Sequence, residues 1–493
     1  MTKDYVIDII KDKYKEWSIG DNIIINFQTG SRKTTFILRI FAQYLSQIND
    51  NAILYLVPRT ELKEHIIKEI KKCFVTNVTV MTYQDLENKI FNEDKEINGY
   101  RYIVCDECHY FIADSWNRKT EVSWQYILGH DSLKIWMSGT GFRVFQILKN
   151  LYNRKELHGN LYEYEGCYDY QYIENIYFFN SKNKFEYIKS VINNVPIGEK
   201  AVYFCSIIKD GNKIFKSIKN KDVFFLTSTE KKSNYNKEAK IQNNKFDADI
   251  LIATSVIDTG ISLEDEQITN IITDIYNVET LVQCIGRKRI NKGEKIVLHI
   301  CNYTKEEITK FKKSTDKNLY DAKNFLKSEF EYLYKYEKDR QLPTNPFLYY
   351  SVKKNSMLIN KLYYTSEYLK SEEFGIQIKH GFDTYLVQKY FKGFEWRKAI
   401  YIDEIETKEK MSQFKEYLDK VAGKKLFVEE QIELMKFISE LNELKEPKTY
   451  KLKSIIKFFN DNKLDYEIKK AKESNRSSDN YNHNYILISE NSK

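Results

Sequence analysis

The chain has 493 residues, of which 42% are hydrophobic and 15% aromatic, so it holds enough apolar material for about three domains of ~100–200 residues each. Its 78 basic and 70 acidic residues give a formal charge of +8, a mild excess that permits binding to nucleic acid without indicating it. No apolar run approaches the ~20 residues that a membrane span needs, and an odd number of cysteines favours reduced thiols. We therefore expect a cytoplasmic protein with no membrane contact.

The N-terminal residues predict a helix, and alternating strands and helices follow it. Residues 1–17 place Val6, Ile9, Ile10, Tyr14 and Trp17 near helical spacing. Apolar runs then predict strands at 22–27, 52–57, 78–81, 102–105 and 134–137, with helices at 34–46 and 62–72. A second series of strands is predicted at 175–179, 201–205, 223–226, 249–253, 268–273 and 295–301. This alternation predicts two α/β units, each with a parallel sheet and crossover helices.

The sequence changes character after residue 305. Long segments rich in Lys, Glu and Tyr have helical spacing, with a break at Pro343 and Pro346. Near the C-terminus, residues 448–459 predict a basic amphipathic helix, and 466–470 and 484–489 predict two short strands. Two interpretations of this module stay open: a contact with nucleic acid, or a packing module with solvated lysines. The lysines concerned are Lys453, Lys457, Lys469, Lys470 and Lys472.

A polar loop lies between the first predicted strand and the first helix of this series. Residues 27–35 read Phe-Gln-Thr-Gly-Ser-Arg-Lys-Thr-Thr. Such a loop presents backbone N–H groups to an anion, with Lys33 on the phosphates of a nucleotide and the Thr34 hydroxyl on Mg²⁺. Arg32 occupies the position where Gly usually precedes the Lys, so a simple polar turn is the alternative interpretation. The other nucleotide-binding candidates of this loop are Gln28, Thr29, Gly30, Ser31, Arg32 and Thr35.

A second candidate site follows the strand predicted at 102–105. The apolar run ends in two carboxylates, of which Asp106 would hold Mg²⁺ and Glu107 would orient or deprotonate an attacking water. Cys105 and Cys108 form a C-x-x-C pattern around them. A zinc site does not fit, because no second pair stands at zinc spacing.

These two sites belong to an ordered set of motifs over about residues 20–305. Residues 27–35 correspond to motif I, 57–62 to Ia, 80–84 to Ib, 106–109 to II, 138–140 to III, 201–206 to IV, 252–261 to V and 283–289 to VI. In this set the chain resembles the DExH-type (DEAD/DEAH-box-like) helicases of superfamily 2. Around motif II, the Tyr-Phe pair at 110–111 and residues 116–120 are similar to helicases of phages and mobile elements in low-GC Gram-positive bacteria.

The resemblance implies two tandem RecA-like lobes with ATP and Mg²⁺ between them, and movement on DNA or RNA, as a single strand or a duplex junction. Motif VI would close over the γ-phosphate, so that Arg287 or Arg289 is the arginine finger. The second arginine comes one residue earlier than in the family's Gly-Arg-x-Gly-Arg spacing, and the sequence leaves open which of the two acts. Gln283 would approach His109 across the nucleotide.

The resemblance also assigns the remaining site residues. Coupling between hydrolysis and lobe motion falls to His109, Ser138 and Thr140, and Asp258 and Gly260 of motif V would contact the nucleotide. Nucleic acid would run over motifs Ia, Ib and V, where hydroxyls, amides and basic groups hold phosphates without reading sequence. The nucleic-acid candidates are Pro58, Arg59, Thr82 and Thr254.

The domains expected are a first RecA-like lobe with an N-terminal helix (1–165), a second lobe (166–305), a mostly α-helical extension (306–446) and a small basic helix-plus-hairpin module (447–493). The leading hypothesis is an ATP-dependent helicase or translocase. A catalytically weak nucleic-acid-binding scaffold is the alternative, motivated by Arg32 and Gly139. A small-molecule kinase is disfavoured, because it has no use for motifs V and VI.

Overall fold

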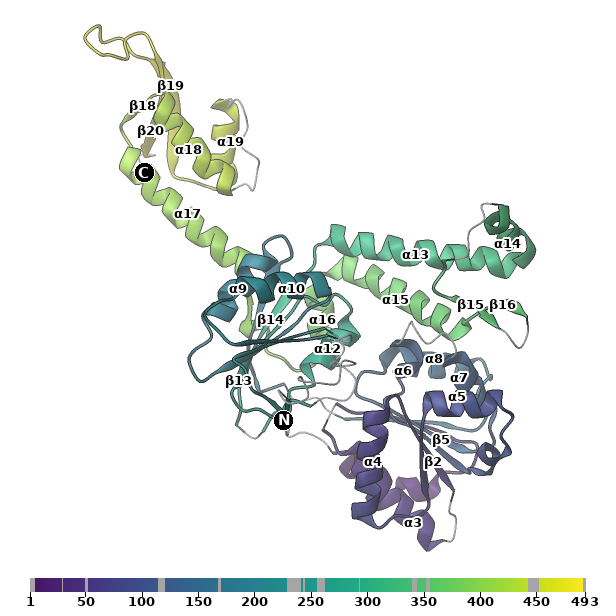
Figure 1. Cartoon of the computed structure of the whole chain (residues 1–493). Coiled ribbons are helices and arrows are strands. Elements are labelled where there is room, and N and C mark those ends of the chain that lie inside the picture. Colours follow the sequence, from purple (N-terminus) through teal and green to yellow (C-terminus); the bar gives the residue numbers. More distant parts are fainter. Residues whose placement is uncertain are drawn as a thin grey trace. The chain divides into compact units, whose positions relative to one another are not determined.

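The computed structural model describes residues 5–28, 30–48, 52–113, 120–166, 170–227, 241–242, 244–254, 262–291, 293–338, 344–351, 355–441 and 452–490. The chain forms two compact units, Met1–Ile400 and Tyr401–Lys493 (Figure 1). Each unit has a hydrophobic core of its own.

The first part of Met1–Ile400 is built on a six-stranded sheet, which we call lobe 1. The strand order is β3-β2-β4-β5-β1-β6, and every neighbouring pair is parallel. Its strands are β1 (Asn22–Asn26), β2 (Ile53–Val57), β3 (Val78–Thr82), β4 (Tyr102–Cys105), β5 (Leu133–Ser138) and β6 (Leu161–Glu165). Because β1, β2, β4 and β5 are buried along their whole length, their side chains are nearly all apolar on both faces.

The crossover helices of lobe 1 cover both faces of this sheet (Figure 1). They are α1 (Val6–Ile10), α2 (Lys33–Phe36), α3 (Ala42–Gln47), α4 (Thr60–Cys73), α5 (Tyr83–Phe91), α6 (Tyr110–Ala113), α7 (Thr120–Gly129) and α8 (Phe142–Asn153), with short turns at Lys13–Glu16 and Lys95–Gly99. The helix expected over residues 1–17 is interrupted at Lys11, whose φ of 50° is left-handed. The helix expected at 34–46 contains a π-helical turn, Ile37–Phe41, between α2 and α3.

A second, seven-stranded sheet forms what we call lobe 2. The order is β17-β7-β14-β13-β8-β12-β9, and the pairs from β7 to β9 are parallel. Its elements are β7 (Ile173–Asn180), α9 (Lys184–Asn193), β8 (Lys200–Phe204), α10 (Ile208–Ser217), β9 (Val223–Leu226), β12 (Ile250–Ala253), β13 (Ile268–Thr273), α12 (Val278–Ile285), β14 (Ile296–Asn302) and β17 (Ala399–Tyr401), with a small ribbon of β10 (Ile241–Gln242) and β11 (Lys245–Phe246). Two parallel sheets with flanking helices are two RecA-like lobes, as the sequence predicts.

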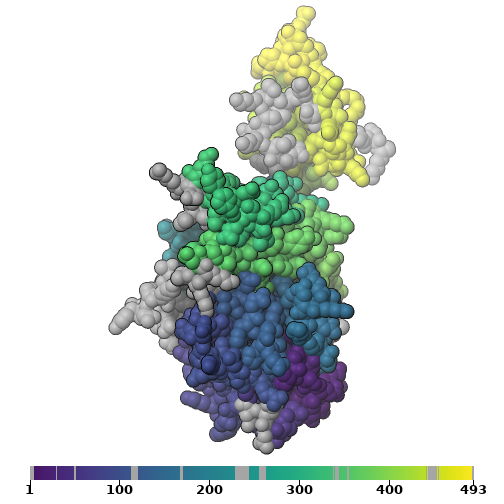
Figure 2. Space-filling model, turned by 90° about the vertical axis from the view of Figure 1, so that its right-hand side faces the viewer, coloured from purple at the N-terminus to yellow at the C-terminus, as the bar shows by residue number. Residues whose placement is uncertain are grey.

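A helical arm follows lobe 2 and packs against both lobes. It consists of α13 (Lys305–Lys327), α14 (Glu329–Lys338), the hairpin β15 (Leu348–Ser351) and β16 (Ser356–Ile359), α15 (Lys361–His380) and α16 (Phe382–Tyr390), followed by a turn at Trp396–Lys398. Leu362 of α15 lies in a core cluster of lobe 1, and the Asn360 side chain donates to the Thr120 hydroxyl (3.1 Å). The Tyr170 hydroxyl donates to the backbone carbonyl of Tyr390, the last residue of α16. Figure 2 views the arm from its far end.

The unit Tyr401–Lys493 combines helices with a three-stranded antiparallel sheet of order β18-β20-β19. Its elements are α17 (Ile402–Val421), β18 (Lys425–Leu426), α18 (Val428–Leu441), α19 (Leu452–Asp461), β19 (Tyr466–Lys472) and β20 (Asn484–Glu490). The helix and the two strands expected near the C-terminus are therefore present. They share one core with α17, where Phe414 and Leu418 pack with Ile455, Phe459 and Ile488.

Within the described part of the chain, none of the helices combines the length and the apolar character that crossing a membrane would require.

Candidate nucleotide site between the lobes

The motifs of lobe 1 meet at one edge of its sheet. In a parallel sheet all strands point the same way, so the segments that follow them lie at the same edge, which is where α/β folds bind ligands. The phosphate loop follows β1, Asp106 follows β4 and Thr140 follows β5. Since β5 lies between β1 and β4, Ser138 at its end stands between the loop and the acidic pair.

The phosphate loop holds its lysine by its own backbone. The Lys33 ammonium donates to the carbonyl oxygens of Phe27 (2.8 Å) and Gln28 (3.3 Å). Ser31 is buried, and its hydroxyl has no hydrogen-bond partner among the described residues. Gly30 has a φ of 80° and Thr35 is exposed, whereas Thr29 lies outside the described residues. A buried hydroxyl with an unused donor beside a lysine suits an anionic ligand.

Arg32 points away from this anion-binding feature. Its φ of 64° is left-handed, which explains why glycine is usual at this position. The guanidinium lies over the Tyr5 ring, 4.4 Å from the centroid, and the side chain is exposed. The Val6 amide donates to the Ser31 carbonyl (3.2 Å), so the N-terminal segment braces the loop.

The two carboxylates after β4 have different surroundings. The Tyr55 hydroxyl donates to Asp106 Oδ2 (2.8 Å), and the Glu107 amide donates to Asp106 Oδ1 (3.0 Å). Glu107 Oε2 lies 3.3 Å from His109 Nδ1. The φ of Glu107 is 49°, a conformation that costs a non-glycine residue free energy and that clusters at functional sites.

Electrostatics separate these two acids. Burial, and then the charge of Glu107, raise the pKa of Asp106. Burial acts to raise the pKa of Glu107 as well, but His109, Lys33 and Arg287 together lower it below its ordinary value. Burial lowers the pKa of Lys33, against the opposing charges of Glu107 and Asp106. Each of these groups therefore acts on the others, and Arg287 contributes from lobe 2.

The residues expected to hold Mg²⁺ lie together. The Tyr55 hydroxyl interacts with both Asp106 and Thr34, so these two oxygen-bearing side chains share one neighbour. Hydroxyl and carboxylate oxygens are the donors that Mg²⁺ prefers, usually with phosphate oxygens and water completing its shell. The donor set fits that ion. Among the described residues, no group of three or more His, Cys, Asp or Glu side chains is arranged to hold a metal, so a Mg²⁺ here would depend on phosphate and water oxygens as well.

Lobe 2 brings two arginines to the same place. Arg287 and Arg289 follow α12, and an isolated bridge between Leu263 and Lys288 ties this segment to the residues that come after motif V. The Arg289 Nε donates to the Ser262 hydroxyl (3.1 Å), while its Nη1 is buried with no hydrogen-bond partner among the described residues. Burial and the charge of Arg287 lower the pKa of Arg289 to about 10. Lys288, between them, pairs instead with Glu294 (2.6 Å).

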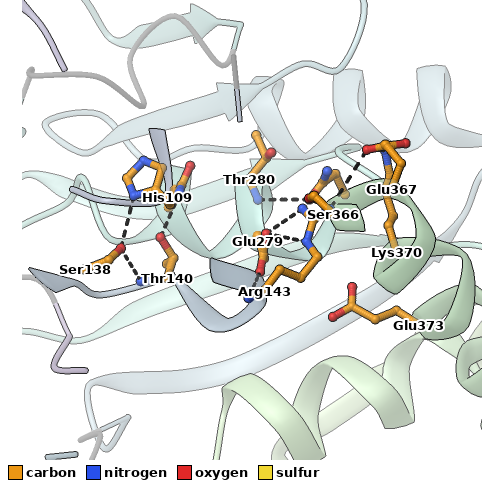
Figure 3. A network of polar contacts seen from close by, with 12 residues as sticks. His109, Ser138, Thr140, Arg143, Glu279, Thr280, Ser366, Glu367, Lys370 and Glu373 are labelled. Atoms are coloured by element: carbon orange, nitrogen blue, oxygen red, sulfur yellow. Dashed lines mark hydrogen bonds and ion pairs between the residues drawn. The ribbon is translucent and has the colours of Figure 1, made fainter. Parts of the chain in front are cut away.

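A chain of hydrogen bonds crosses from lobe 1 to lobe 2 (Figure 3). The Ser138 hydroxyl contacts His109 Nδ1 (3.0 Å) and accepts from the Thr140 amide (3.1 Å). The Gln283 side chain donates to the Thr140 hydroxyl (2.7 Å). Gln283 of α12 is thus linked to His109 through Thr140 and Ser138.

A buried ion pair lies next to this chain of hydrogen bonds. Arg143 of α8 donates from Nε (2.8 Å) and Nη2 (2.5 Å) to one oxygen of Glu279 in α12, and its backbone amide donates to the other (3.2 Å). Nη1 donates to the Ser366 hydroxyl of α15 (3.4 Å) and lies 4.0 Å from Glu367 (Figure 3). Lobe 1, lobe 2 and the arm therefore meet at one guanidinium.

The nucleic-acid candidates lie at the ends of their strands. Pro58 is buried and Arg59 half-buried, directly after β2. Thr82 caps α5, where its hydroxyl accepts from the Asp85 amide (3.0 Å) in a capping box. Thr254 is buried at the end of β12. The motif V candidates Asp258 and Gly260 lie outside the described residues.

Several residues of the site carried no sequence signal. Tyr55 lies in an apolar run, yet its hydroxyl donates to the Asp106 carboxylate. Tyr83 lies within motif Ib, but nothing in the sequence predicts that its hydroxyl donates to the backbone carbonyl of Asp106. Arg143 and Glu279 are ordinary charged residues of amphipathic helices until the fold brings them together. Only Tyr55 offers a local sequence signal for such a role, because it is the one residue with a hydroxyl in the otherwise apolar strand β2.

The fold thus defines a chain with two RecA-like lobes. Residues 183–291 match the family model described as the helicase conserved C-terminal domain, and residues 3–79 and 75–142 match the model of the type III restriction enzyme, res subunit. These matches fall on lobe 2 and lobe 1, and they support a superfamily 2 helicase type. No curated protein sequence matches the chain.

Solved structures of helicases have a similar arrangement of elements. S. cerevisiae Dbp5 bound to RNA and ADP BeF3 is 17% identical with a TM-score of 0.42, over 57% of this chain and 78% of that one. Mss116p bound to ssRNA and AMP-PNP is 14% identical with a TM-score of 0.43, over 59% and 68%. The DUF1998 helicase MrfA bound to DNA is 14% identical with a TM-score of 0.42, over 61% and 49%. At these values the similarities carry no argument about what this chain binds.

Proposed function

We propose that this chain is an ATP-dependent helicase or translocase, which hydrolyses ATP between its two RecA-like lobes and moves along DNA or RNA. One observation carries the proposal. Lys33, Asp106 and Glu107 of lobe 1 share an electrostatic environment with Arg287 and Arg289 of lobe 2. Cations from two lobes around an acidic pair match the demands of phosphoryl transfer, where charge develops on the phosphate oxygens.

Each residue has a role in this proposal. Lys33 and the arginines neutralise phosphate charge, and the ionised Glu107 orients the attacking water and accepts its proton. His109 holds Glu107 in place at 3.3 Å. Thr34 and Asp106 hold the Mg²⁺, which when bound neutralises charge on the β- and γ-phosphates. Arg287 and Arg289 are both candidates for the arginine finger, because the charge of each acts on or is acted on by Glu107.

Coupling to movement follows from the same geometry. The hydrogen bond from Gln283 to Thr140 joins lobe 2 to lobe 1, so it requires the two lobes to be in contact. A γ-phosphate held between Lys33 and the arginines would also pull the lobes together, and its loss on hydrolysis would weaken the contact between them. Separation and closure of the lobes would then move a bound strand. The track is held by phosphate contacts at Arg59, Thr82 and Thr254, so binding is sequence-tolerant and salt-dependent.

The proposal extends to organisation and subtype. The DExH-type motif II and the residues that flank it, at 110–111 and 116–120, favour a helicase of a phage or mobile element. The proposed segments are the two lobes at 1–165 and 166–305, the helical extension at 306–446 and the basic module at 447–493, of which the last two share the compact unit Tyr401–Lys493 from Tyr401 onward.

The test is ATP hydrolysis by purified variants. Lys33→Ala and Glu107→Gln should each lower kcat by a factor of about 100 or more, because each removes charge stabilisation or water activation. Glu107→Gln should still bind ATP. Lys71→Ala, at an exposed position of α4, is the matched control and should hydrolyse ATP at the wild-type rate. Near-normal turnover in either site variant would place the chemistry elsewhere.

The alternative function is a nucleic-acid-binding scaffold that hydrolyses ATP poorly. The observation in its favour is that Lys33 bonds carbonyl oxygens of its own loop, contacts that ATP must displace. A wild-type protein that binds nucleic acid but has negligible ATPase activity, with or without it, would select this function.

A further inference from the structure

A row of exposed lysines lies along one side of α13. These residues follow one another at intervals of three or four, except where Tyr320 takes the place of a lysine, so they share one side of the helix over ~26 Å. None of them has an ion pair among the described residues. The row consists of Lys310, Lys313, Lys317, Lys323 and Lys327.

The acidic residues of this part of α13 are engaged elsewhere. Asp316 accepts from Lys312 (2.9 Å) and from the Ser371 hydroxyl of α15. Asp321 accepts from the Tyr332 hydroxyl (2.6 Å) and from Asn345 (3.0 Å). Because like charges at i,i+4 destabilise a helix, a bound anion would relieve the repulsion within this row.

Exposed aromatic rings accompany the row. Tyr320 is 66% exposed, and on α14 Phe330 and Tyr334 are 78% and 59% exposed. The rings of Phe330 and Tyr334 lie nearly parallel, at an interplanar angle of 17° and with centroids 6.1 Å apart. Figure 1 shows α14 at the outer end of the arm. Its large exposed rings form a surface that no other described part of the chain covers.

We propose that the lysine row of α13, together with the exposed rings of Tyr320, Phe330 and Tyr334, binds single-stranded nucleic acid; we call these residues the lysine–aromatic face. The lysines would take the phosphates, and the rings would stack on bases. A duplex keeps the faces of its bases covered, so exposed rings select a single strand. The inference rests on the proposed function, and it adds a track contact outside the two lobes.

The test measures the affinity of the full chain for labelled oligothymidylate and oligouridylate by fluorescence anisotropy, between about 50 and 200 mM salt. Lys313→Ala/Lys317→Ala should weaken binding and reduce the slope of log K against log salt by about 1.4, at ~0.7 per lost contact. Lys216→Ala/Lys219→Ala, at exposed positions in lobe 2, changes the net charge equally and should leave both unchanged. Phe330→Ala/Tyr334→Ala should lower affinity about 5- to 150-fold per stacked base at an unchanged slope.

The outcomes separate the two proposals. A wild-type chain that binds neither oligonucleotide overturns the proposed function. A wild-type chain that binds, with both face variants equal to it in affinity and slope, overturns the lysine–aromatic face alone. Loss in the lysine variant without loss in the aromatic variant contradicts base stacking, and so contradicts the single-stranded partner. ATP hydrolysis without nucleic acid, measured in the same samples, should be unchanged in every variant, because none of these residues lies at the ATP site.

Discussion

Replacing Arg143 with Ala should weaken the contact between the lobes more than any other single change outside the ATP site. The substitution removes both side-chain hydrogen bonds to Glu279 and the bond to Ser366, while the backbone amide still donates to Glu279. Glu279 is 5% exposed, so its charge would stay buried without its cation. Glu367 and Glu373 also face Arg143, since together with Glu279 they raise its pKa against the effect of burial.

The expected magnitude follows from this burial. Removing one partner of a buried ion pair costs about 3–5 kcal/mol, because the other charge is left uncompensated. α8 belongs to lobe 1 and α12 to lobe 2, and Arg287 follows α12 directly. Suppose that ~1.4 kcal/mol of this loss destabilises the closed arrangement of the lobes in which ATP is hydrolysed. The ATPase rate would then fall about tenfold.

Urea unfolding followed by tryptophan fluorescence, together with steady-state ATP hydrolysis, checks this prediction. Arg154→Ala is the matched control, an exposed arginine directly after α8, and it should change stability by less than about 0.5 kcal/mol. The double variant Arg143→Met/Glu279→Leu replaces both charges with apolar groups and should recover most of the stability. An Arg143→Ala protein that unfolds and hydrolyses ATP like the wild type would refute the reasoning.

Three further predictions test other parts of the chain. Arg32→Gly should keep the ATPase rate within about threefold, because Arg32 is exposed over Tyr5 and glycine accepts the left-handed φ at lower cost; a large gain in rate would mean that Arg32 blocks the loop. Burial lowers the pKa of His299 to about 4 from its ordinary 6.5, so between these pH values the imidazole is protonated in the unfolded chain and neutral in the folded one. The free energy of unfolding should therefore be full above pH 6.5 and fall by about 3 kcal/mol as the pH drops toward 4. The melting temperature of His299→Gln should depend less on pH between 4 and 6.5 than that of the wild type. An unchanged dependence would mean that His299 is not the group whose protonation destabilises the fold. Truncation after Tyr401, which keeps the whole of β17 in lobe 2, should leave basal ATPase intact. If the C-terminal lysines bind phosphates, it should also reduce the salt dependence of nucleic-acid binding, whereas an unchanged slope of log K against log salt would leave only the packing role.

Where both faces of a strand are buried, the sequence predicted it within one or two residues. The runs at 102–105 and 223–226 coincide with β4 and β9. β6 (Leu161–Glu165) was missed, because an edge strand has one half-exposed face and its Leu-Tyr-Glu-Tyr-Glu pattern alternates only weakly. The hairpin of β15 and β16 was missed as well, since its short strands lie within a Lys- and Tyr-rich region of helical spacing.

The candidate site divides in the same way. Motif residues such as Lys33 and Asp106 are recognisable because loop chemistry and strand position are local properties. The residues that hold them depend on tertiary contacts: Tyr55 is 51 positions from Asp106, and Arg143 is 136 from Glu279. No spacing rule connects such positions in a single sequence, so only the folded chain reveals them.

The most direct test of the central claim is the steady-state rate of ATP hydrolysis by the full chain, measured with and without single-stranded DNA and RNA beside the Glu107→Gln variant. We expect the wild type to hydrolyse ATP and at least one of the two nucleic acids to raise its rate. Glu107→Gln should lose both the basal and the stimulated hydrolysis. Hydrolysis that neither nucleic acid changes, or that persists in Glu107→Gln, would contradict the proposal.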